Sequence, residues 1–196
     1  FLTLVRTFAI FVPQYPHPIS AVSFFLVFLV IKLSIYNNIK LFHMEFSIII
    51  PTFKNYNYCK LTIDSIKKNS SFIHEIIVHL NGIDVNTEKY LNSEKILYTK
   101  SNENIGLCSG VNKATSLSSK EYVLYSHDDM YFLPKWDNAL VDELTDINND
   151  RFYLSMTQIA PTGPVKGSIQ HIQYDCGDSI ENFDKEKLLK NFNSFN

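Results

Sequence analysis

Short apolar runs alternate with amphipathic stretches between residue 45 and about residue 144. The apolar runs are rich in β-branched residues, and their length is typical of strands buried on both faces of a sheet. They occupy residues 45–53, 75–80, 95–99 and 121–126. Apolar residues at helical spacing occupy residues 58–68, 104–117 and 134–144. This alternation predicts a mostly parallel sheet flanked by crossover helices, which is an α/β fold.

Polar or turn-forming residues follow three of the predicted strands. They are Pro51-Thr52-Phe53, Asn81-Gly82 and His127-Asp128-Asp129. In parallel sheets, ligands bind beyond the carboxyl ends of the strands. Because these ends lie at the same edge of a sheet, we expect the three segments to converge on one ligand site.

The third segment carries two adjacent acids, Asp128 and Asp129, at the end of a buried strand. Ionised carboxylates are costly to bury unless a cation or strong hydrogen-bond donors meet them. Hard cations such as Mg²⁺ and Mn²⁺ are usually held by one or two carboxylates together with substrate phosphates. The pair therefore favours a divalent-metal site. A solvated turn after the strand is the alternative that these residues leave open.

Several of these segments, in their order and spacing, resemble the family 2 glycosyltransferases. The resemblance extends from residue 45 to at least residue 144. It is carried by residues 47–53, by residues 76–78, by Asn104-Ile105-Gly106 with Asn112 and Ala114, and by His127-Asp128-Asp129. Members of this family are inverting enzymes of the GT-A (Rossmann-like) fold that use nucleotide-diphospho-sugars. The resemblance therefore implies an enzyme that transfers a sugar from a UDP-, GDP- or dTDP-linked donor to a glycan, lipid or protein acceptor.

The resemblance also implies roles for individual residues. The expected nucleotide-binding residues are Pro51, Thr52, Phe53, Asn81, Asn104, Gly106, Asn112, His127 and Asp128. Asp129 is the expected ligand of a divalent metal, Mn²⁺ or Mg²⁺, which would stabilise the charge that develops on the leaving diphosphate.

Two positions depart from the family pattern. Asn81 replaces an acid that often reads the base, and its amide offers both a donor and an acceptor, so the nucleobase stays open. His127 replaces the first acid of the metal motif. Its imidazole is expected to bind ribose or to orient a ligand, because hard cations prefer oxygen.

The segment after residue 144 predicts a strand at residues 151–156, a Pro/Gly-rich loop and a helix at residues 185–192. Inverting transfer needs a general base, and no segment here resembles the base region of the family. Asp175 and Asp178 are interpreted as turn residues. We therefore expect the GT-A domain to be truncated at its C-terminus, with the catalytic base beyond Asn196.

Two alternative functions remain open at this point. One is a nucleotide-sugar binding fragment without turnover. The other is a nucleotidyltransferase, which would be expected to carry a glycine-rich, basic phosphate loop after the first strand. Residues 51–55 lack such a loop.

Composition narrows the range of partners and compartments. The chain has 18 basic and 20 acidic side chains, so it lacks the basic surplus of a nucleic-acid-binding protein. Cys59, Cys108 and Cys176 show no metal-binding spacing, and an odd number of scattered cysteines is typical of a reducing compartment. These features favour a cytoplasmic protein. Cys59 and Cys108 fall in predicted helices and are expected to be buried thiols.

The first 43 residues differ from the rest of the chain. They contain no acid, and residues 19–31 are uncharged and strongly apolar. A helix of that length spans roughly 20 Å, against about 30 Å of bilayer hydrocarbon. Because Met44 directly precedes the first strand, we favour a domain at residues 44–196 that begins at a native start, with residues 1–43 as upstream sequence. Membrane contact through residues 19–36 is the alternative.

Overall fold

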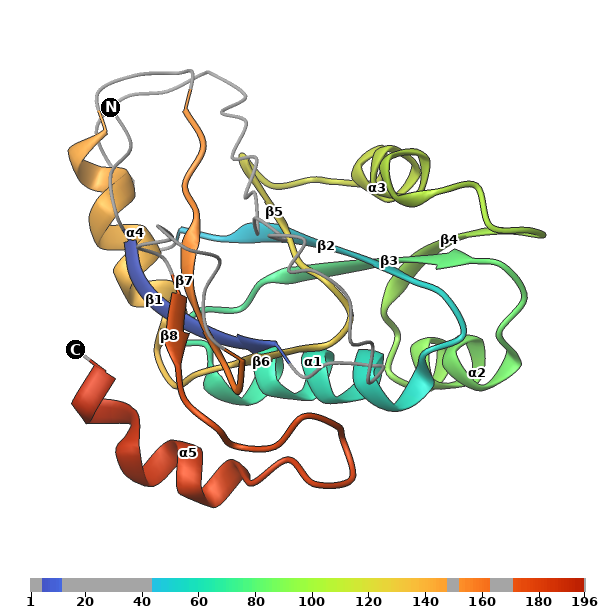
Figure 1. Ribbon diagram of the computed structural model, residues 1–196. Helices are drawn as coiled ribbons and strands as arrows, with labels where there is room; N and C mark the ends of the chain where they lie inside the picture. Colours follow the sequence, from blue (N-terminus) through green and yellow to red (C-terminus); the bar gives the residue numbers. More distant parts are fainter. Residues whose placement is uncertain (1–4, 12–43, 148–151, 163–170, 196) are drawn as a thin grey trace.

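The computed structural model describes residues 5–11, 44–147, 152–162 and 171–195 (Figure 1). Its central sheet consists of four parallel strands in the order β4-β3-β2-β5. The strands are β2 (Phe46–Thr52), β3 (Glu75–Asn81), β4 (Leu97–Ser101) and β5 (Tyr122–Tyr125). The expected α/β class with a mostly parallel sheet is confirmed.

Helices cover both faces of this sheet. The helices are α1 (Tyr56–Asn69), α2 (Val85–Ser93) and α3 (Leu107–Thr115). Figure 1 shows α1 and α2 on one face and α3 on the other. Successive residues of β2 face opposite layers, because side chains alternate along a strand. Ile48 and Ile50 pack in the core cluster that includes Ile63 of α1, whereas Ile49 packs with Ala114 of α3.

A second sheet has the order β6-β1-β7-β8. Its strands are β1 (Val5–Phe11), β6 (Met130–Phe132), β7 (Met156–Ala160) and β8 (His171–Gln173). The helices α4 (Trp136–Asp146) and α5 (Lys185–Asn191) and the 3-10 helix η1 (Phe192–Phe195) complete the described elements. Strand β1 pairs antiparallel with β6 and parallel with β7. Part of the expected N-terminal extension therefore pairs with the second sheet, and the domain boundary at Met44 stays a prediction.

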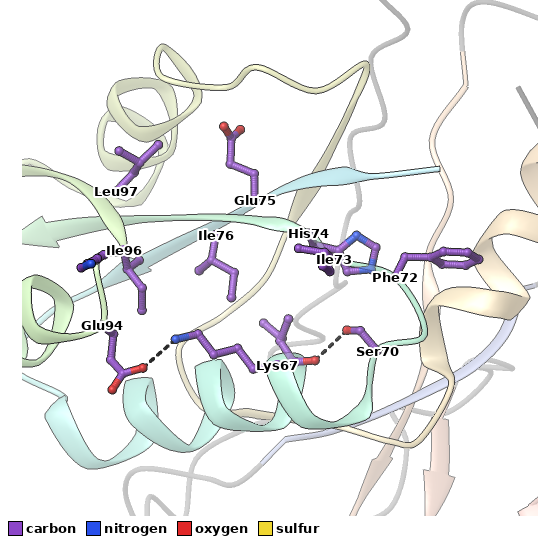
Figure 2. Close-up of a pocket in the computed structure, with 12 residues that line it drawn as sticks. Lys67, Ser70, Phe72, Ile73, His74, Glu75, Ile76, Glu94, Ile96 and Leu97 are labelled. Atoms are coloured by element: carbon purple, nitrogen blue, oxygen red, sulfur yellow. Dashed lines mark hydrogen bonds and ion pairs between the residues drawn. The ribbon is translucent and has the colours of Figure 1, made fainter. Parts of the chain in front are cut away.

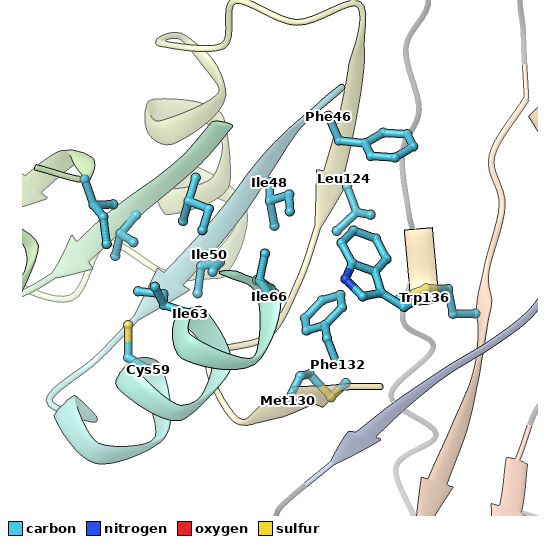
Figure 3. Close-up of a cluster of buried hydrophobic side chains, with 14 of the residues drawn as sticks. Phe46, Ile48, Ile50, Cys59, Ile63, Ile66, Leu124, Met130, Phe132 and Trp136 are labelled. Atoms are coloured by element: carbon cyan, nitrogen blue, oxygen red, sulfur yellow. The ribbon is translucent and has the colours of Figure 1, made fainter. Parts of the chain in front are cut away.

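Aromatic side chains join the two sheets. Trp136 of α4, Phe46 of β2 and Phe132 of β6 are almost fully buried in the same core cluster (Figure 3). The rings of Phe132 and Trp136 meet edge to face with centroids 4.8 Å apart, a geometry that aromatic rings favour. This cluster fixes β6 beneath the end of the central sheet, and the segment between β5 and β6 is therefore anchored on both sides.

The structure corrects several predicted boundaries. The strand expected at residues 151–156 begins only at Met156, and Pro134 lies outside α4 because the left-handed Lys135 (φ 61°) caps that helix. Cys59 is buried, but Cys108 is exposed in the first turn of α3, where the helix faces solvent. The apolar segment at residues 19–31 lies outside the described residues. In the part of the chain that the structure describes, no helix has the length and apolar character needed to cross a bilayer.

Candidate functional site

The carboxyl ends of β2, β3 and β5 lie at one edge of the central sheet. Strand β2 lies between the other two, with Thr52 opposite Leu80 of β3 and Ile49 opposite Tyr125 of β5. Ser126 extends the pairing, since its N–H donates to the carbonyl of Ile49 over 2.9 Å. The structure therefore brings the three predicted polar segments to the same edge.

Asp129 is a buried carboxylate at this edge. Its side chain is 5% exposed, and its Oδ1 atom has no hydrogen-bond partner among the residues that the structure describes. Burial raises the pKa of Asp129 well above its ordinary value, and the neighbouring charge of Asp128 raises it further. A buried carboxylate with an unsatisfied oxygen is costly. A bound cation would remove this cost.

Helix α1 holds the turn that carries the two acids. The Thr62 hydroxyl donates to the carbonyl of Asp128 over 2.9 Å and accepts from the N–H of Met130 over 2.9 Å. Thr62 is fully buried, and so is its neighbour on the same face, Ser65 at 3% exposure. The apolar pattern of residues 58–68 does not single out this threonine. Only its hydrogen bonds to residues far away in the sequence distinguish it from an ordinary core residue.

His127 pairs with a tyrosine that the sequence reasoning did not single out. The Tyr125 hydroxyl and the His127 Nε2 atom lie 3.2 Å apart. Burial lowers the pKa of His127, so its imidazole is favoured in the neutral form. Burial, together with Asp128 and Asp129, raises the pKa of Tyr125, so its phenol keeps its proton. A neutral imidazole and a phenol beside two acids can supply hydrogen bonds but no compensating positive charge.

Asn81 ties the end of β3 to the loop before α3. Its Oδ1 atom accepts from the N–H of Ile105 over 2.7 Å, and its Nδ2 atom donates to the carbonyl of Gly106 over 3.3 Å. Asn104 shapes the same loop by accepting from the N–H of Gly106 over 2.9 Å. Gly106 caps α3 at φ 83°, a conformation that favours glycine. Asn81 therefore has an observed structural contact in addition to its proposed role toward the base.

The segment after β2 is only partly buried. Thr52 is 3% exposed, whereas Phe53 is 46% exposed and its ring lies against Gly82. A Cβ atom on Gly82 would approach the Phe53 ring to 3.1 Å, and the φ of Gly82 is 123°. The exposed Phe53 ring therefore flanks the ends of both β2 and β3, where a planar base could stack on it.

Asn112 does not join this edge through any buried contact. It lies on an exposed part of α3, while Gly110 and Ala114 face the sheet. Gly110 lets α3 approach β3 closely, because a Cβ atom there would meet the His79 ring at 2.7 Å.

A later loop reaches the same region. The N–H of Ile180 donates to the Tyr58 hydroxyl over 3.2 Å. Burial raises the pKa of Tyr58, and the charges of Glu181, Asp129 and Asp178 add to that shift. Asp178 accepts from the Asn182 side chain over 2.5 Å, which supports its interpretation as a turn residue. Asp175 acts similarly, since it accepts from the N–H of Gly177 over 2.9 Å.

The protein groups at the acidic turn fit a metal only together with a ligand. Within residues 5–11, 44–147, 152–162 and 171–195, no group of three or more His, Cys, Asp and Glu side chains could hold a metal ion. Mg²⁺ is commonly bound by one or two carboxylates plus substrate phosphates. The single turn with Asp128 and Asp129 matches that donor set.

A separate pocket of about 450 Å³ opens at the opposite edge of the sheet (Figure 2). Ile76 and Ile96 line it, and an ion pair between Lys67 and Glu94 with an N–O distance of 2.8 Å spans one side. None of the predicted site residues lines this pocket. We locate the candidate site at the carboxyl edge, because the polar strand ends and the unsatisfied carboxylate lie there.

Comparisons with known proteins identify the family of this chain. A family model described as "Glycosyl transferase family 2" matches residues 47–194. No curated protein matches the chain significantly.

The solved structures that match include several of TarS from S. aureus. The structure of TarS residues 1–349 is 22% identical, with a TM-score of 0.45 over 52% of this chain and 32% of that one. Another TarS structure is 26% identical, with a TM-score of 0.43 over 51% of this chain and 20% of that one. A TarS complex with UDP-GlcNAc is 22% identical, with a TM-score of 0.45 over 52% and 30% of the two chains. The chain spans less than a third of each of these proteins.

Proposed function

The chain belongs to glycosyl transferase family 2, and on that premise we propose that its strand-end site binds the nucleotide part of a nucleotide-diphospho-sugar. The observation that carries the proposal is the buried Asp129 carboxylate, whose Oδ1 atom has no partner among the described residues. This group lies at the sheet edge where ligands of parallel α/β proteins bind. The resulting activity is transfer of the sugar to an acceptor.

Each strand end has a task in this proposal. Phe53 and Asn81 border the base and ribose, with Pro51 and Thr52 forming the floor beneath them. The loop of Asn104 and Gly106 and the helix with Asn112 flank the nucleotide. His127 and Asp128 contact the ribose side. These assignments rest on the family motif and on the convergence of the strand ends.

Asp129 is the proposed ligand of Mn²⁺ or Mg²⁺. Such a cation, when bound, neutralises the charge that develops on the leaving diphosphate. Asp129 contributes a carboxylate whose Oδ1 atom accepts no hydrogen bond from the described residues. The neutral His127 and the protonated Tyr125 beside it leave the positive charge of the site to the cation. The general base that accepts the acceptor proton is expected beyond Asn196 and stays a prediction.

Calorimetric titration tests the proposal directly. UDP, GDP and dTDP are titrated into the folded chain with Mn²⁺, with Mg²⁺, and with a chelator in place of metal. We expect one nucleoside diphosphate to bind best, and chelation to weaken that binding by more than tenfold. Equal binding of all three without metal, or no binding by the folded chain, would contradict the proposal. Binding without sugar transfer would instead favour the alternative of a fragment that binds but does not turn over.

A further inference from the structure

Helix α1 presents a polar face to strand β6. Thr62, Ser65 and Asn69 recur at spacings of three and four residues, so they lie on one side of the helix. Ser65 accepts from the N–H of Phe132 over 2.9 Å, and Asn69 donates to the carbonyl of Phe132 over 2.5 Å. These side chains satisfy backbone groups of β6 that a neighbouring strand would otherwise satisfy.

Thr62 differs from Ser65 and Asn69 in the backbone groups to which it hydrogen-bonds. Its hydroxyl contacts the carbonyl of Asp128 and the N–H of Met130, so it bridges the two peptide units that flank Asp129. The orientations of those two peptide units set the backbone dihedrals of Asp129 and thereby the direction of its Cα–Cβ bond. The fully buried Thr62 hydroxyl therefore fixes the direction in which the Asp129 side chain leaves the main chain.

We propose that Thr62 is a positioning residue for the site of the divalent cation and diphosphate. The inference rests on the proposed function and assigns a specific task to a side chain that touches neither ligand. The buried position of the Asp129 carboxylate is energetically unfavourable, because the group is beside Asp128 and has an unsatisfied oxygen. A turn free to relax would rotate this carboxylate toward water. The two hydrogen bonds of Thr62 hold the turn against that relaxation.

Ser65 supplies a matched control. It lies one helical turn from Thr62, it is almost equally buried, and it makes a bond of the same length to a backbone N–H of β6. Its hydroxyl also donates to the carbonyl of Thr62 over 2.8 Å within the helix, but its partner in β6, Phe132, is three residues beyond Asp129, so Ser65 makes no direct hydrogen bond to the acidic turn. A purely structural role predicts the same outcome for both residues, and a positioning role predicts different outcomes.

The experiment compares Thr62→Val, Thr62→Ser and Ser65→Ala in the full chain. The probe is Mn²⁺ binding in the presence of UDP, GDP or dTDP, measured by electron paramagnetic resonance as the loss of free Mn²⁺ signal beyond that caused by the same nucleotide without protein. We expect Thr62→Val to weaken binding by more than tenfold. Thr62→Ser keeps the hydroxyl and is expected to stay within threefold of the wild type. Ser65→Ala is expected to lose thermal stability but to stay within threefold in binding. Thr62→Ala serves as a second variant with the same expectation if the valine variant does not fold.

Amide hydrogen exchange gives a readout that needs no ligand. Thr62→Val is expected to speed exchange at Met130 and not at Phe132, and Ser65→Ala is expected to do the reverse. Unchanged Mn²⁺ affinity in Thr62→Val, or an equal loss in Ser65→Ala, would overturn the inference. A wild-type chain that binds no Mn²⁺ with any of the three nucleotides overturns the proposed function instead. In that case unchanged exchange at Met130 in Thr62→Val overturns the positioning of the turn.

Discussion

Two buried aspartates show how the surroundings of a residue decide its chemistry. Each has an Oδ1 atom without a hydrogen-bond partner among the described residues, but the pKa of Asp129 is raised by burial and by Asp128. Burial alone would also raise the pKa of Asp137, but hydrogen bonds from His74 and from the N–H groups of Ser71 and Phe72 outweigh it and lower that pKa. Hydrogen bonds from the protein therefore stabilise the charge of Asp137, whereas the charge of Asp129 needs a cation from outside the protein.

Replacing Asp129 by Asn is expected to separate folding from binding. The change removes a buried carboxylate and keeps the shape, so the free energy of unfolding of the metal-free chain is expected to stay the same or to rise. Mn²⁺-dependent nucleotide binding should fall by more than tenfold, a loss above about 1.4 kcal/mol. Urea unfolding and calorimetry measure the two effects. The control Asp128→Asn is expected to lose less binding, and equal losses would contradict the assignment of Asp129 as the principal ligand.

Asp137→Asn is expected to lower the free energy of unfolding. Asp137 is fully buried and accepts hydrogen bonds of 2.7 and 2.8 Å from backbone N–H groups, so the change should cost about 1–3 kcal/mol near neutral pH. An aspartate in an unfolded chain titrates near pH 4. Because the folded pKa lies lower, the contribution is present above about pH 4 and is lost as the pH falls through the folded pKa.

Urea unfolding of the wild type and Asp137→Asn at several pH values measures this difference. The gap is expected to be largest near neutral pH and to shrink below about pH 4. The control is Asp142→Asn on the same helix, since Asp142 is exposed. A gap that stays constant with pH would show that the Asp137 charge does not stabilise the fold.

At the scale of the elements, helix α3 depends on a glycine for its distance from the sheet. His79 is fully buried, and its Nδ1 atom lies 2.8 Å from the Thr99 hydroxyl, so its ring has little freedom to move. Gly110 lies directly over that ring. The position of α3 in turn sets the position of the loop with Asn104 and Gly106.

Gly110→Ala is expected to push α3 away from β3. The added methyl group would lie 2.7 Å from the His79 ring, and overpacking of this kind costs about 1–3 kcal/mol. Nucleotide affinity should fall as well, because the loop before α3 moves with the helix. Thermal unfolding and calorimetry check the two effects. For comparison of stability, Gly106→Ala meets no atom within 4 Å but sits at φ 83° and ψ 162°, a conformation essentially limited to glycine, so it should cost about 1–3 kcal/mol through backbone strain.

Strands β2 and β3 could be predicted from the sequence because they are buried on both faces. Residues 46–52 are buried throughout, which makes a continuous apolar signal. Helix α2 was not predicted, since its sequence VNTEKYLNS is mostly polar and it buries only Thr87, Tyr90 and Leu91. Strands β6 and β8 have three residues each, too few for a periodic pattern.

The site was likewise predictable only where it has a local sequence pattern. The strand ends and the acidic pair were predictable, because their polar residues interrupt apolar runs. The contacts of Tyr125, Tyr58 and Thr62 were not, since they join residues that are distant in sequence or depend on the side-chain direction.

At the scale of the whole molecule, the described residues before Met44 take no part in the central sheet. Strand β2 pairs with β3 and β5, and no strand of this sheet pairs with β1 within the part of the chain that the structure describes. We therefore propose that residues 44–196 fold by themselves around the central sheet, although the second sheet would lose β1, the strand between β6 and β7.

A chain shortened to begin at Met44 tests this proposal. We expect its unfolding to stay cooperative and its nucleotide affinity to stay within threefold of the full chain, because the strand ends are unaltered. Thermal unfolding and calorimetry give both quantities. Loss of cooperative unfolding would show that the pairing of β1 with β6 and β7 is essential to the domain.

The order of the strands also determines when the acidic turn can form during folding. Thr62 contacts Met130 across 68 positions of the chain, and Lys120 contacts Ser47 across 73. Closing loops of that length is entropically costly, so contacts within β2, α1 and β3 are expected to form earlier. Asp129 lies four residues after β5, which is the last strand of the central sheet along the chain. The two adjacent acids are therefore expected to lose their water only at a late stage of assembly, when the rest of the sheet can hold the turn.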